Sequence, residues 1–495
     1  MKKVVVIGSG FAGMSAASFM AKAGWDVTIL EKQSMPGGRG RKFEEQGFVF
    51  DMGPSWYWMP DVFERYFNCF GKKVADYYEL KRLDPSYRVY YADGPVDIPA
   101  DYTQLQRLFE EIEPGSSLRL DAFLKEAAYK YEVGINKLVH KPGRNLTEFL
   151  DLDLAKGLLR LDVFTSMKKH VSKYFTHPKL IQLIEFPVLF LGALPADIPA
   201  LYSLMNYADI KLGTWYPQGG MYNIADAMFQ LATELGVKFR FNCDVKEILI
   251  EKSSAKSVRA SDEQGNTVIM EADVVICGAD YHFIESSLLP VSCRTYTEHY
   301  WNKRVMAPSC LLYYIGLNKR LTGITHHSLF FDVDFDQHGK EIYDEPQWPK
   351  EPLFYVSAPS VTDHTVAPEG CENLFFLIPV ATGLSGDSEE LRQHYFEKIV
   401  KRYEQQTGHN ISGSIIFQRS YSVSDFISDY NAFKGNAYGL ANTLMQTAIL
   451  KPALKSGKVN NLYYTGQLTV PGPGVPPSLI SGQVVAKEIS RLFRE

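Results

Sequence analysis

Residues 3–39 read KVVVIGSGFAGMSAASFMAKAGWDVTILEKQSMPGGR, and this stretch contains the pattern of a strand, a helix and a second strand. Lys3–Ile7 is a short β-branched run suited to a buried parallel strand. Phe11–Ala23 is rich in small residues and predicts a helix that packs closely on a sheet and ends at Gly24. Asp26–Leu30 predicts the next strand. The stretch therefore predicts the first βαβ unit of a parallel α/β sheet.

The turn between the first strand and the helix carries the motif Gly8-x-Gly10-x-x-Gly13. Gly8 allows a tight turn, Gly10 lets the backbone approach a pyrophosphate, and Gly13 lets the helix pack on the sheet. Glu31 follows at the end of the second strand, where its carboxylate can accept hydrogen bonds from an adenosine ribose and would repel a 2′-phosphate. These residues predict a Rossmann-type domain for FAD or NAD rather than NADP.

A second glycine motif, Pro36-Gly37-Gly38-Arg39, lies just beyond Glu31. Its two glycines expose backbone N–H groups, and Arg39 can make charge-assisted hydrogen bonds to phosphate oxygens. The motif resembles the second motif of FAD-binding amine oxidases and their relatives, which NAD-only dehydrogenases normally lack. It therefore favours FAD as the cofactor.

Composition limits the remaining possibilities. A chain of 495 residues exceeds the roughly 250–300 residues at which single cores stop growing, so we expect two domains or a large insertion. Apolar residues make up 45% of the chain, which excludes a mostly disordered protein. A net charge of −5 gives no reason to expect nucleic-acid binding. The six cysteines form no CxxC pair, so we expect no zinc site and a reducing compartment.

The chain shows no apolar run long enough to span a membrane, which takes about 18 residues. The Met1-Lys2-Lys3 start and the apolar run after it could be mistaken for a signal peptide, but Gly8-Ser9-Gly10 breaks that run at once. We therefore expect a cytoplasmic protein that is soluble or peripherally associated with a membrane.

Further α/β elements lie in the middle and at the end of the chain. Met221–Leu235 predicts a helix, and Ala272–Cys277 predicts a buried strand. Asn461–Thr465 predicts a closing strand before a helix from about Pro477 to Leu492. We therefore predict an α/β, Rossmann-type FAD-binding domain interleaved with a larger α+β substrate domain. The FAD domain is predicted over residues 1–70, 211–290 and 456–495, and the substrate domain over 71–210 and 291–455.

The loop Val470-Pro-Gly-Pro-Gly-Val-Pro-Pro477 joins that last strand to the last helix. Proline suits the first turn of a helix, because its missing N–H would be unbonded there anyway. A helix N-terminus aimed at the N1/C2 carbonyl edge of a flavin would stabilise the negative charge that appears when the flavin accepts a hydride.

Taken together, these motifs resemble the bacterial and fungal phytoene desaturases, a family of FAD-dependent carotenoid desaturases. The matching blocks span the whole chain and are Gly8–Arg39, Asp51-x-Gly53-Pro54, Gly213–Met221, Asn461–Pro476 and, more weakly, Ala272–Val275 with Ala279-Asp280. The resemblance implies an apolar polyene drawn from a membrane and hydride transfer to flavin N5 with loss of a neighbouring proton. The residues predicted to bind FAD are Gly8, Gly10, Phe11, Ala12, Gly13, Glu31, Lys32, Gly38, Arg39, Gly53, Pro54, Ser55, Val245, Gly466, Gln467, Gly474, Val475 and Pro476.

Several functions stay open at this level. Within the family, phytoene desaturation is our main prediction, and the alternatives are a later 3,4-desaturation of a hydroxylated carotenoid or a carotenoid isomerase or saturase. Outside it stand an amine oxidase and a non-enzymatic prenyl-binding protein such as a GDP dissociation inhibitor. Oxygen or a quinone would accept the electrons. We assign no catalytic base and no metal, and we interpret His326-His327 as part of a solvated loop.

Two apolar segments are candidates for contact with substrate or membrane. Phe186–Leu194 and Ile198–Met205 could form an interfacial helix, line a tunnel or belong to the ordinary core. Lys168-Lys169, Lys173 and Lys179 could meet anionic head groups or form a solvated basic face. The cluster Trp56-Tyr-Trp-Met-Pro60 could line an apolar cavity or belong to the core.

Overall fold

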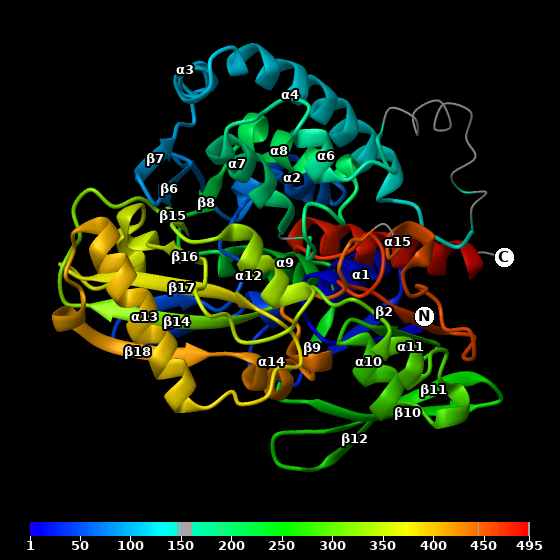
Figure 1. Ribbon diagram of the computed structural model, residues 1–495. Coiled ribbons are helices and arrows are strands. Elements are labelled where there is room, and N and C mark those ends of the chain that lie inside the picture. The colour runs from blue at the N-terminus through cyan, green and yellow to red at the C-terminus, as the bar shows by residue number, and fades with distance from the viewer. Residues whose placement is uncertain (146–147, 149–160, 190, 444, 494–495) are drawn as a thin grey trace.

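The strand predicted from Lys3–Ile7, β1, lies at the centre of a five-stranded parallel sheet. The structure is a computed structural model that describes residues 1–145, 148, 161–189, 191–443 and 445–493 (Figure 1). The sheet order is β19-β13-β1-β2-β9. Its other strands are β2 (Asp26–Leu30), β9 (Lys238–Arg240), β13 (Val274–Cys277) and β19 (Leu462–Tyr464). The sheet thus joins segments from the start, middle and end of the chain.

α1 (Phe11–Lys22) packs on this sheet, and α9 (Tyr222–Glu234) and α15 (Val475–Leu492) pack against α1. α1 and α15 make the closest contact, because a Cβ on Gly482 would lie 2.4 Å from the carbonyl oxygen of Ala12. Only glycine allows the two helices to approach so closely. A separate antiparallel sheet contains β10 (Asp244–Glu251), β11 (Ser254–Ser261) and β12 (Thr267–Glu271).

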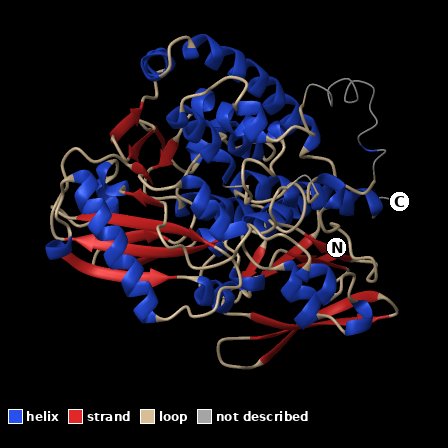
Figure 2. Ribbon diagram, viewed as in Figure 1, coloured by secondary structure: helices blue, strands red, loops and turns tan. Residues whose placement is uncertain are grey.

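A seven-stranded mixed sheet forms a second layer, which Figure 2 shows in red at the left. Its order is β18-β14-β17-β16-β15-β6-β7. The strands are β6 (Tyr87–Tyr91), β7 (Gly94–Ile98), β14 (Ser309–Leu317), β15 (His327–Phe331), β16 (Phe354–Ser357), β17 (Glu372–Val380) and β18 (Ile415–Tyr421). These strands come from within 71–210 and 291–455, although the exact domain boundaries stay a prediction.

The two faces of this sheet pack against different partners. On one face α13 (Glu389–Thr407) packs with Tyr395 and Phe396 against Tyr313 and Phe330. On the other face, Phe331 and its neighbours join the main core of the protein. Side chains alternate between the faces of a strand, so His327, which stands four residues before Phe331 on β15, points to the same side as Phe331.

α7 (Pro178–Leu189) and α12 (Phe335–Tyr343) pack on that second face, since Phe186 and Phe335 both contact Phe331. Further helices lie together in the upper part of Figure 1, namely α2 (Pro60–Asn68), α3 (Tyr102–Ile112), α4 (Ser116–Val133), α6 (Met167–Val171) and α8 (Leu204–Tyr207). The remaining elements are the pairs β3 (Lys42–Glu45) with β4 (Phe48–Asp51) and β5 (Leu80–Arg82) with β8 (Trp215–Pro217), and the helices α10 (Tyr281–Phe283), α11 (Glu298–Asn302) and α14 (Val423–Tyr430).

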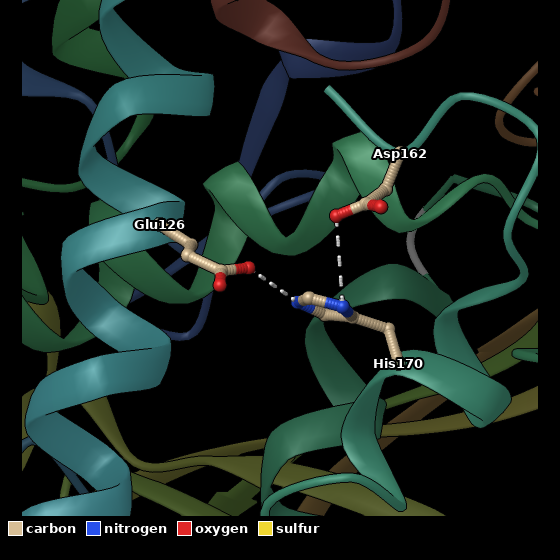
Figure 3. Close-up of side chains that lie close together, drawn as sticks. All are labelled: Glu126, Asp162 and His170. Atoms are coloured by element: carbon tan, nitrogen blue, oxygen red, sulfur yellow. Dashed lines mark ion pairs between the residues drawn. The ribbon is translucent and has the colours of Figure 1, made fainter. Parts of the chain in front are cut away.

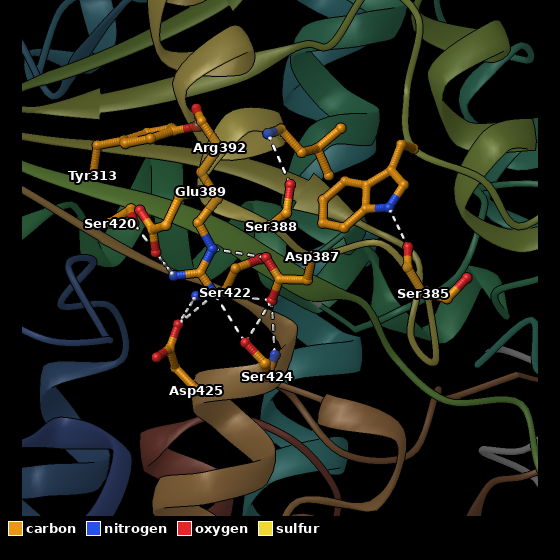
Figure 4. Close-up of polar contacts among 12 residues, drawn as sticks. Tyr313, Ser385, Asp387, Ser388, Glu389, Arg392, Ser420, Ser422, Ser424 and Asp425 are labelled. Carbon is orange, nitrogen blue, oxygen red and sulfur yellow. Dashed lines mark hydrogen bonds and ion pairs between the residues drawn. The ribbon is translucent and has the colours of Figure 1, made fainter.

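A buried arginine fixes the start of α14 (Figure 4). Arg392 on α13 is 7% exposed, and its Nε lies 2.7 Å from Oδ1 of Asp387. Its Nη2 lies 2.8 Å from Oδ2 of Asp425 and donates to Oγ of Ser424 at 2.9 Å. These contacts tie the first turn of α14 to the seven-stranded sheet layer, and the opposite end of α14 reaches the cleft described below.

None of the described helices combines the length and the hydrophobicity that crossing a bilayer would require. In the segment predicted to contact a membrane or line a tunnel, Phe186, Val188 and Leu191 are buried, and Phe190 lies outside the described residues. These side chains belong to the main core of the protein and do not form an exposed surface. Membrane contact itself stays a prediction.

Candidate active site

The carboxyl ends of β1 and β2 open onto a cleft that encloses about 1090 Å³, part of it open to solvent. Gly8 and Gly10 follow β1, and Glu31 follows β2, and all three line this cleft. This is the edge at which open parallel α/β sheets bind their ligands. The cleft is therefore the candidate cofactor site.

The N-terminus of α1 faces the cleft without a side-chain cap. Gly10 is the N-cap residue, and a Cβ there would meet no protein atom within 4 Å. At Gly13, in contrast, a Cβ would lie 2.1 Å from the carbonyl oxygen of Gly8. Gly10 thus borders open space, whereas Gly13 holds the helix against the strand. An uncapped helix N-terminus of this kind attracts a diphosphate.

Glu31 is held in one orientation at the cleft wall. Its Oε2 accepts hydrogen bonds from the backbone N–H and the hydroxyl of Ser9, both at 2.8 Å. Its Oε1 accepts from the backbone N–H of Gln33 at 2.9 Å. The carboxylate is buried, so its position does not depend on solvent. A fixed carboxylate at the end of β2 is suited to binding ribose hydroxyls.

Arg39 supplies a buried positive charge to the cleft. Its Nη2 donates to the carbonyl oxygen of Asn436 at 3.1 Å, and its Cζ lies 5.2 Å from the ring centre of Tyr430. Burial lowers the pKa of Arg39, and the nearby Asp280 carboxylate opposes that shift. Among the described residues its buried Nε has no partner. This orphaned donor, the open helix N-terminus and the fixed Glu31 all fit bound FAD.

The C-terminal end of α14 closes one side of the cleft, a feature that sequence patterns did not predict. Lys32 Nζ donates to the carbonyl oxygen of Ser428 at 2.8 Å, and Arg41 Nη2 lies 2.8 Å from Oδ2 of Asp429. The residues of this end that line the cleft are Asp429, Tyr430 and Asn431. They lie nearly 400 positions beyond Lys32 in the chain, so no local motif could have indicated them.

Most of the residues predicted to bind FAD meet in this cleft. Those that line it are Gly8, Gly10, Phe11, Ala12, Glu31, Lys32, Gly38, Arg39, Val245, Gly466 and Gln467. Those that do not line it are Gly13, Gly53, Pro54, Ser55, Gly474, Val475 and Pro476. Asp280 also lines the cleft, and only the weak Ala279-Asp280 match could have indicated it.

The predicted residues outside the cleft have identifiable places. A Cβ on Gly53 would lie 2.2 Å from the carbonyl oxygen of Arg39, so Gly53 packs directly behind that residue. Ser55 borders a smaller cavity together with Asp51. Gly474 is the N-cap of α15, which begins at Val475, two residues earlier than predicted. The first turn of α15 still reaches the cleft through Ser478.

An aromatic group lies beyond Gly53, at the second face of the seven-stranded sheet. Trp56 is partly buried and packs against Tyr87, Phe186 and Tyr355, with ring centres 5.5, 6.1 and 5.4 Å away. Trp58 is buried beside it. We call Trp56, Trp58, Tyr87, Phe186, His327 and Tyr355 the aromatic group. Apart from His327, these rings belong to the main core of the protein or pack against it.

The prediction that His326-His327 lies in a solvated loop is wrong. Both side chains are buried, at 4% and 0% exposure, because β15 is an inner strand of the seven-stranded sheet. Nδ1 of His326 lies 2.8 Å from Oγ1 of Thr362, and burial lowers the pKa of His326 to about 3. Both imidazoles therefore belong to the interior of the protein.

A cluster of three side chains lies outside the lining of the cleft, and its members point toward one another (Figure 3): Glu126, Asp162 and His170. His170 lies 3.7 Å from Oε2 of Glu126 and 3.8 Å from Oδ2 of Asp162. The buried ammonium of Lys130 also lies here, 3.0 Å from Asp162 and 3.3 Å from His170 Nε2. Because Lys130 already supplies a positive charge, we interpret this cluster as a structural network.

Comparison with known proteins agrees with the fold and the cleft. A family model described as flavin containing amine oxidoreductase matches residues 11–490. A solved oxidoreductase from Methanosarcina mazei superimposes with a TM-score of 0.62 at 17% identity, covering 98% of this chain and 100% of that one. A solved putrescine oxidase variant gives a TM-score of 0.60 at 12% identity, covering 100% and 99%. The chain is thus an FAD-dependent oxidoreductase with the amine-oxidase-like fold.

Relatives of higher sequence identity show which family of flavoproteins the chain belongs to. The chain is 42% identical over 488 residues to a carotenoid 3,4-desaturase of Haloarcula japonica, covering 98% of this chain and 97% of the relative. It is 31% identical over 494 residues to a zeta-carotene-forming phytoene desaturase of Myxococcus xanthus, covering 99% and 94%. The chain belongs to the carotenoid desaturases.

Proposed function

We propose that this protein is a carotenoid 3,4-desaturase. The observation that carries the proposal is 42% identity to the Haloarcula 3,4-desaturase, compared with 31% to the Myxococcus phytoene desaturase, over nearly the full length of each. This difference favours the later desaturation step over phytoene desaturation, which was our main prediction from sequence.

The cleft residues would divide the binding of FAD among them. The N-terminus of α1 at Gly10 would bind the pyrophosphate, and Glu31 would bind the adenosine ribose. Arg39, with its orphaned Nε, would donate to the cofactor from the same side as Asn436 and Tyr430. The N-terminus of α15 would place the positive end of its dipole near the cleft through the turn that contains Ser478.

FAD, when bound, accepts the hydride that leaves the substrate. The chain itself would hold the polyene against the aromatic group, which excludes water and keeps the reacting carbons in a fixed orientation. No described side chain is assigned as the base that takes the proton. An apolar substrate dissolves in the membrane, so we propose that the protein is cytoplasmic and associates peripherally with a membrane. Oxygen or a quinone would accept the electrons from the reduced cofactor.

A product assay tests the proposal. Purified protein reconstituted with FAD would be given liposomes that contain either phytoene or a hydroxylated carotenoid with a longer conjugated system, with a quinone or oxygen as acceptor. The absorption spectrum of the extract would be recorded, because each new conjugated double bond shifts it to longer wavelength.

We expect a red shift only with the hydroxylated carotenoid. A red shift from phytoene instead would establish the early desaturase and contradict the proposal. No shift with either substrate, despite bound FAD and an acceptor, would also contradict it and would point to an isomerase or to a non-carotenoid substrate.

A further inference from the structure

His327 is the one member of the aromatic group that carries a basic nitrogen. Its ring stacks on Trp56 with ring centres 4.1 Å apart and planes at 14°. Its Nδ1 lies 2.6 Å from the hydroxyl oxygen of Tyr355. Because the ring is held by both contacts and is fully buried, the position of its other nitrogen, Nε2, is fixed.

Nε2 of His327 is buried and has no hydrogen-bond partner among the described residues. Other polar atoms in the aromatic group are engaged: Tyr87 donates its hydroxyl proton to Asp209 at 2.8 Å, and Trp58 donates from Nε1 to Thr214 at 2.8 Å. A buried polar atom without a partner destabilises the folded protein. A ligand that supplies the missing partner would recover part of that cost.

The surroundings select a neutral ligand group. Burial lowers the pKa of His327 well below its ordinary value, and His326 beside it lowers it further, so the ring is neutral near pH 7. The rings within stacking distance, those of Trp56, His326 and Tyr355, carry no formal charge. A carboxylate would need a buried cation here, whereas a hydroxyl needs only one hydrogen bond.

The place of the ring relative to the cleft also fits a group at the end of the substrate. Trp56 stands three residues after Gly53, and Gly53 packs directly against the backbone of Arg39 in the cofactor cleft. In a 3,4-desaturation the reacting carbons are near the end of the polyene, so the end group lies only a few bonds from them. A site for that end group must therefore lie close to the cofactor.

From these contacts we propose that Nε2 of His327 binds the terminal hydroxyl group of the carotenoid. The proposal rests on the proposed 3,4-desaturase function and makes His327 a residue that determines substrate specificity. A hydroxyl can pair with either imidazole tautomer, because it both donates and accepts a hydrogen bond. The hydroxyl of Tyr355 can likewise donate to Nδ1 or accept from it, so this contact holds the orientation of the ring in either tautomer.

The test compares the binding of two ligands to the FAD-loaded enzyme in detergent micelles. One is a hydroxylated carotenoid, and the other is the hydrocarbon of the same length and conjugation that lacks the hydroxyl. The variant His327→Phe keeps a ring on Trp56 and removes both nitrogens, and His327→Gln restores an N–H near the position of Nε2. His326→Phe is the matched control, since it removes the adjacent buried imidazole, which bonds Thr362 instead.

We expect the wild-type protein to prefer the hydroxylated ligand, and the ratio of the two Kd values to fall about 5-fold in His327→Phe, as loss of one neutral hydrogen bond implies. His327→Gln should keep most of the preference, and His326→Phe should keep all of it. If His327→Phe retains bound flavin and the wild-type ratio, the assignment of His327 is wrong. If His327→Phe loses its flavin, His327→Leu is measured in its place. Loss of the preference in His327→Leu, with an unchanged Kd for the hydrocarbon, would support the assignment, and a retained preference would overturn it.

This readout is independent of turnover. Absence of a red-shifted product from the wild-type protein would overturn the proposed function, whereas an unchanged Kd ratio in the His327 variants would overturn only the end-group site.

Discussion

Glu31→Gln removes one negative charge from the cofactor cleft while keeping the size of the side chain. In the native protein the carboxylate already accepts three hydrogen bonds, two from Ser9 and one from Gln33. The glutamine carbonyl can still accept from Ser9, but the amide N–H₂ would then face the N–H of Gln33. The variant therefore loses one internal hydrogen bond and places two donors opposite each other.

The effect on FAD can be worked out from the same geometry. Hydrogen bonds to a charged acceptor contribute about 1.5–3 kcal/mol, compared with about 0.5–1.5 kcal/mol for neutral pairs. Replacing the carboxylate that would bind the ribose by an amide thus costs about 1.4 kcal/mol, which is about a tenfold rise in Kd. Glu31→Ala removes the acceptor entirely and should weaken FAD binding further.

Titration of apo-protein with FAD, followed by flavin fluorescence, measures this Kd. Glu44→Gln is the control, because Glu44 is exposed on β3 and pairs with Lys42. Its Kd should equal that of the wild-type protein. A Glu31→Gln variant that binds FAD as tightly as the control would refute the assignment of Glu31 to the ribose and with it the placement of the adenosine in the cleft.

Four further changes test the structure. Gly10→Val should abolish FAD retention but leave the melting temperature of the apo-protein nearly unchanged, since the valine side chain enters open space. Gly13→Ala should lower that melting temperature, because the alanine Cβ would meet the carbonyl oxygen of Gly8. Arg392→Met leaves two carboxylates unpaired near the start of α14 and should cost about 3 kcal/mol in urea unfolding; a loss below about 1 kcal/mol would contradict the network. Burial raises the pKa of Glu185 to about 7, so the stability that this group contributes is full below pH 4.5 and is lost as the pH rises through 7. At pH 8, Glu185→Gln should therefore be more stable than the wild-type protein by up to about 3 kcal/mol and should melt at a higher temperature. At pH 4.5 the two proteins should differ little, and an equal gain in stability at both pH values would refute this.

Sequence motifs predicted the cofactor domain well for a physical reason. The βαβ unit from Lys3 to Leu30 is a local structure whose strand, turn and helix follow from neighbouring residues, and the structure places each element within a residue of its predicted bounds. The glycine motif and Glu31 lie on that unit, so their meeting at one cleft could be predicted as well. The family resemblance identified the chain as a carotenoid desaturase but named the earlier step as the main reaction.

Other features depended on contacts between distant parts of the chain. The end of α14 meets Lys32 through Ser428 and Arg41 through Asp429, while Arg392 holds the first turn of the same helix on a different layer. His327 is buried because β6, from early in the chain, pairs with β15 and makes it an inner strand. The sequence by itself determined the cofactor and the family, since local patterns encode them. Only the tertiary structure decided which side chains are buried together beside the cleft and in the aromatic group, because burial is set by packing between segments that no single pattern spans.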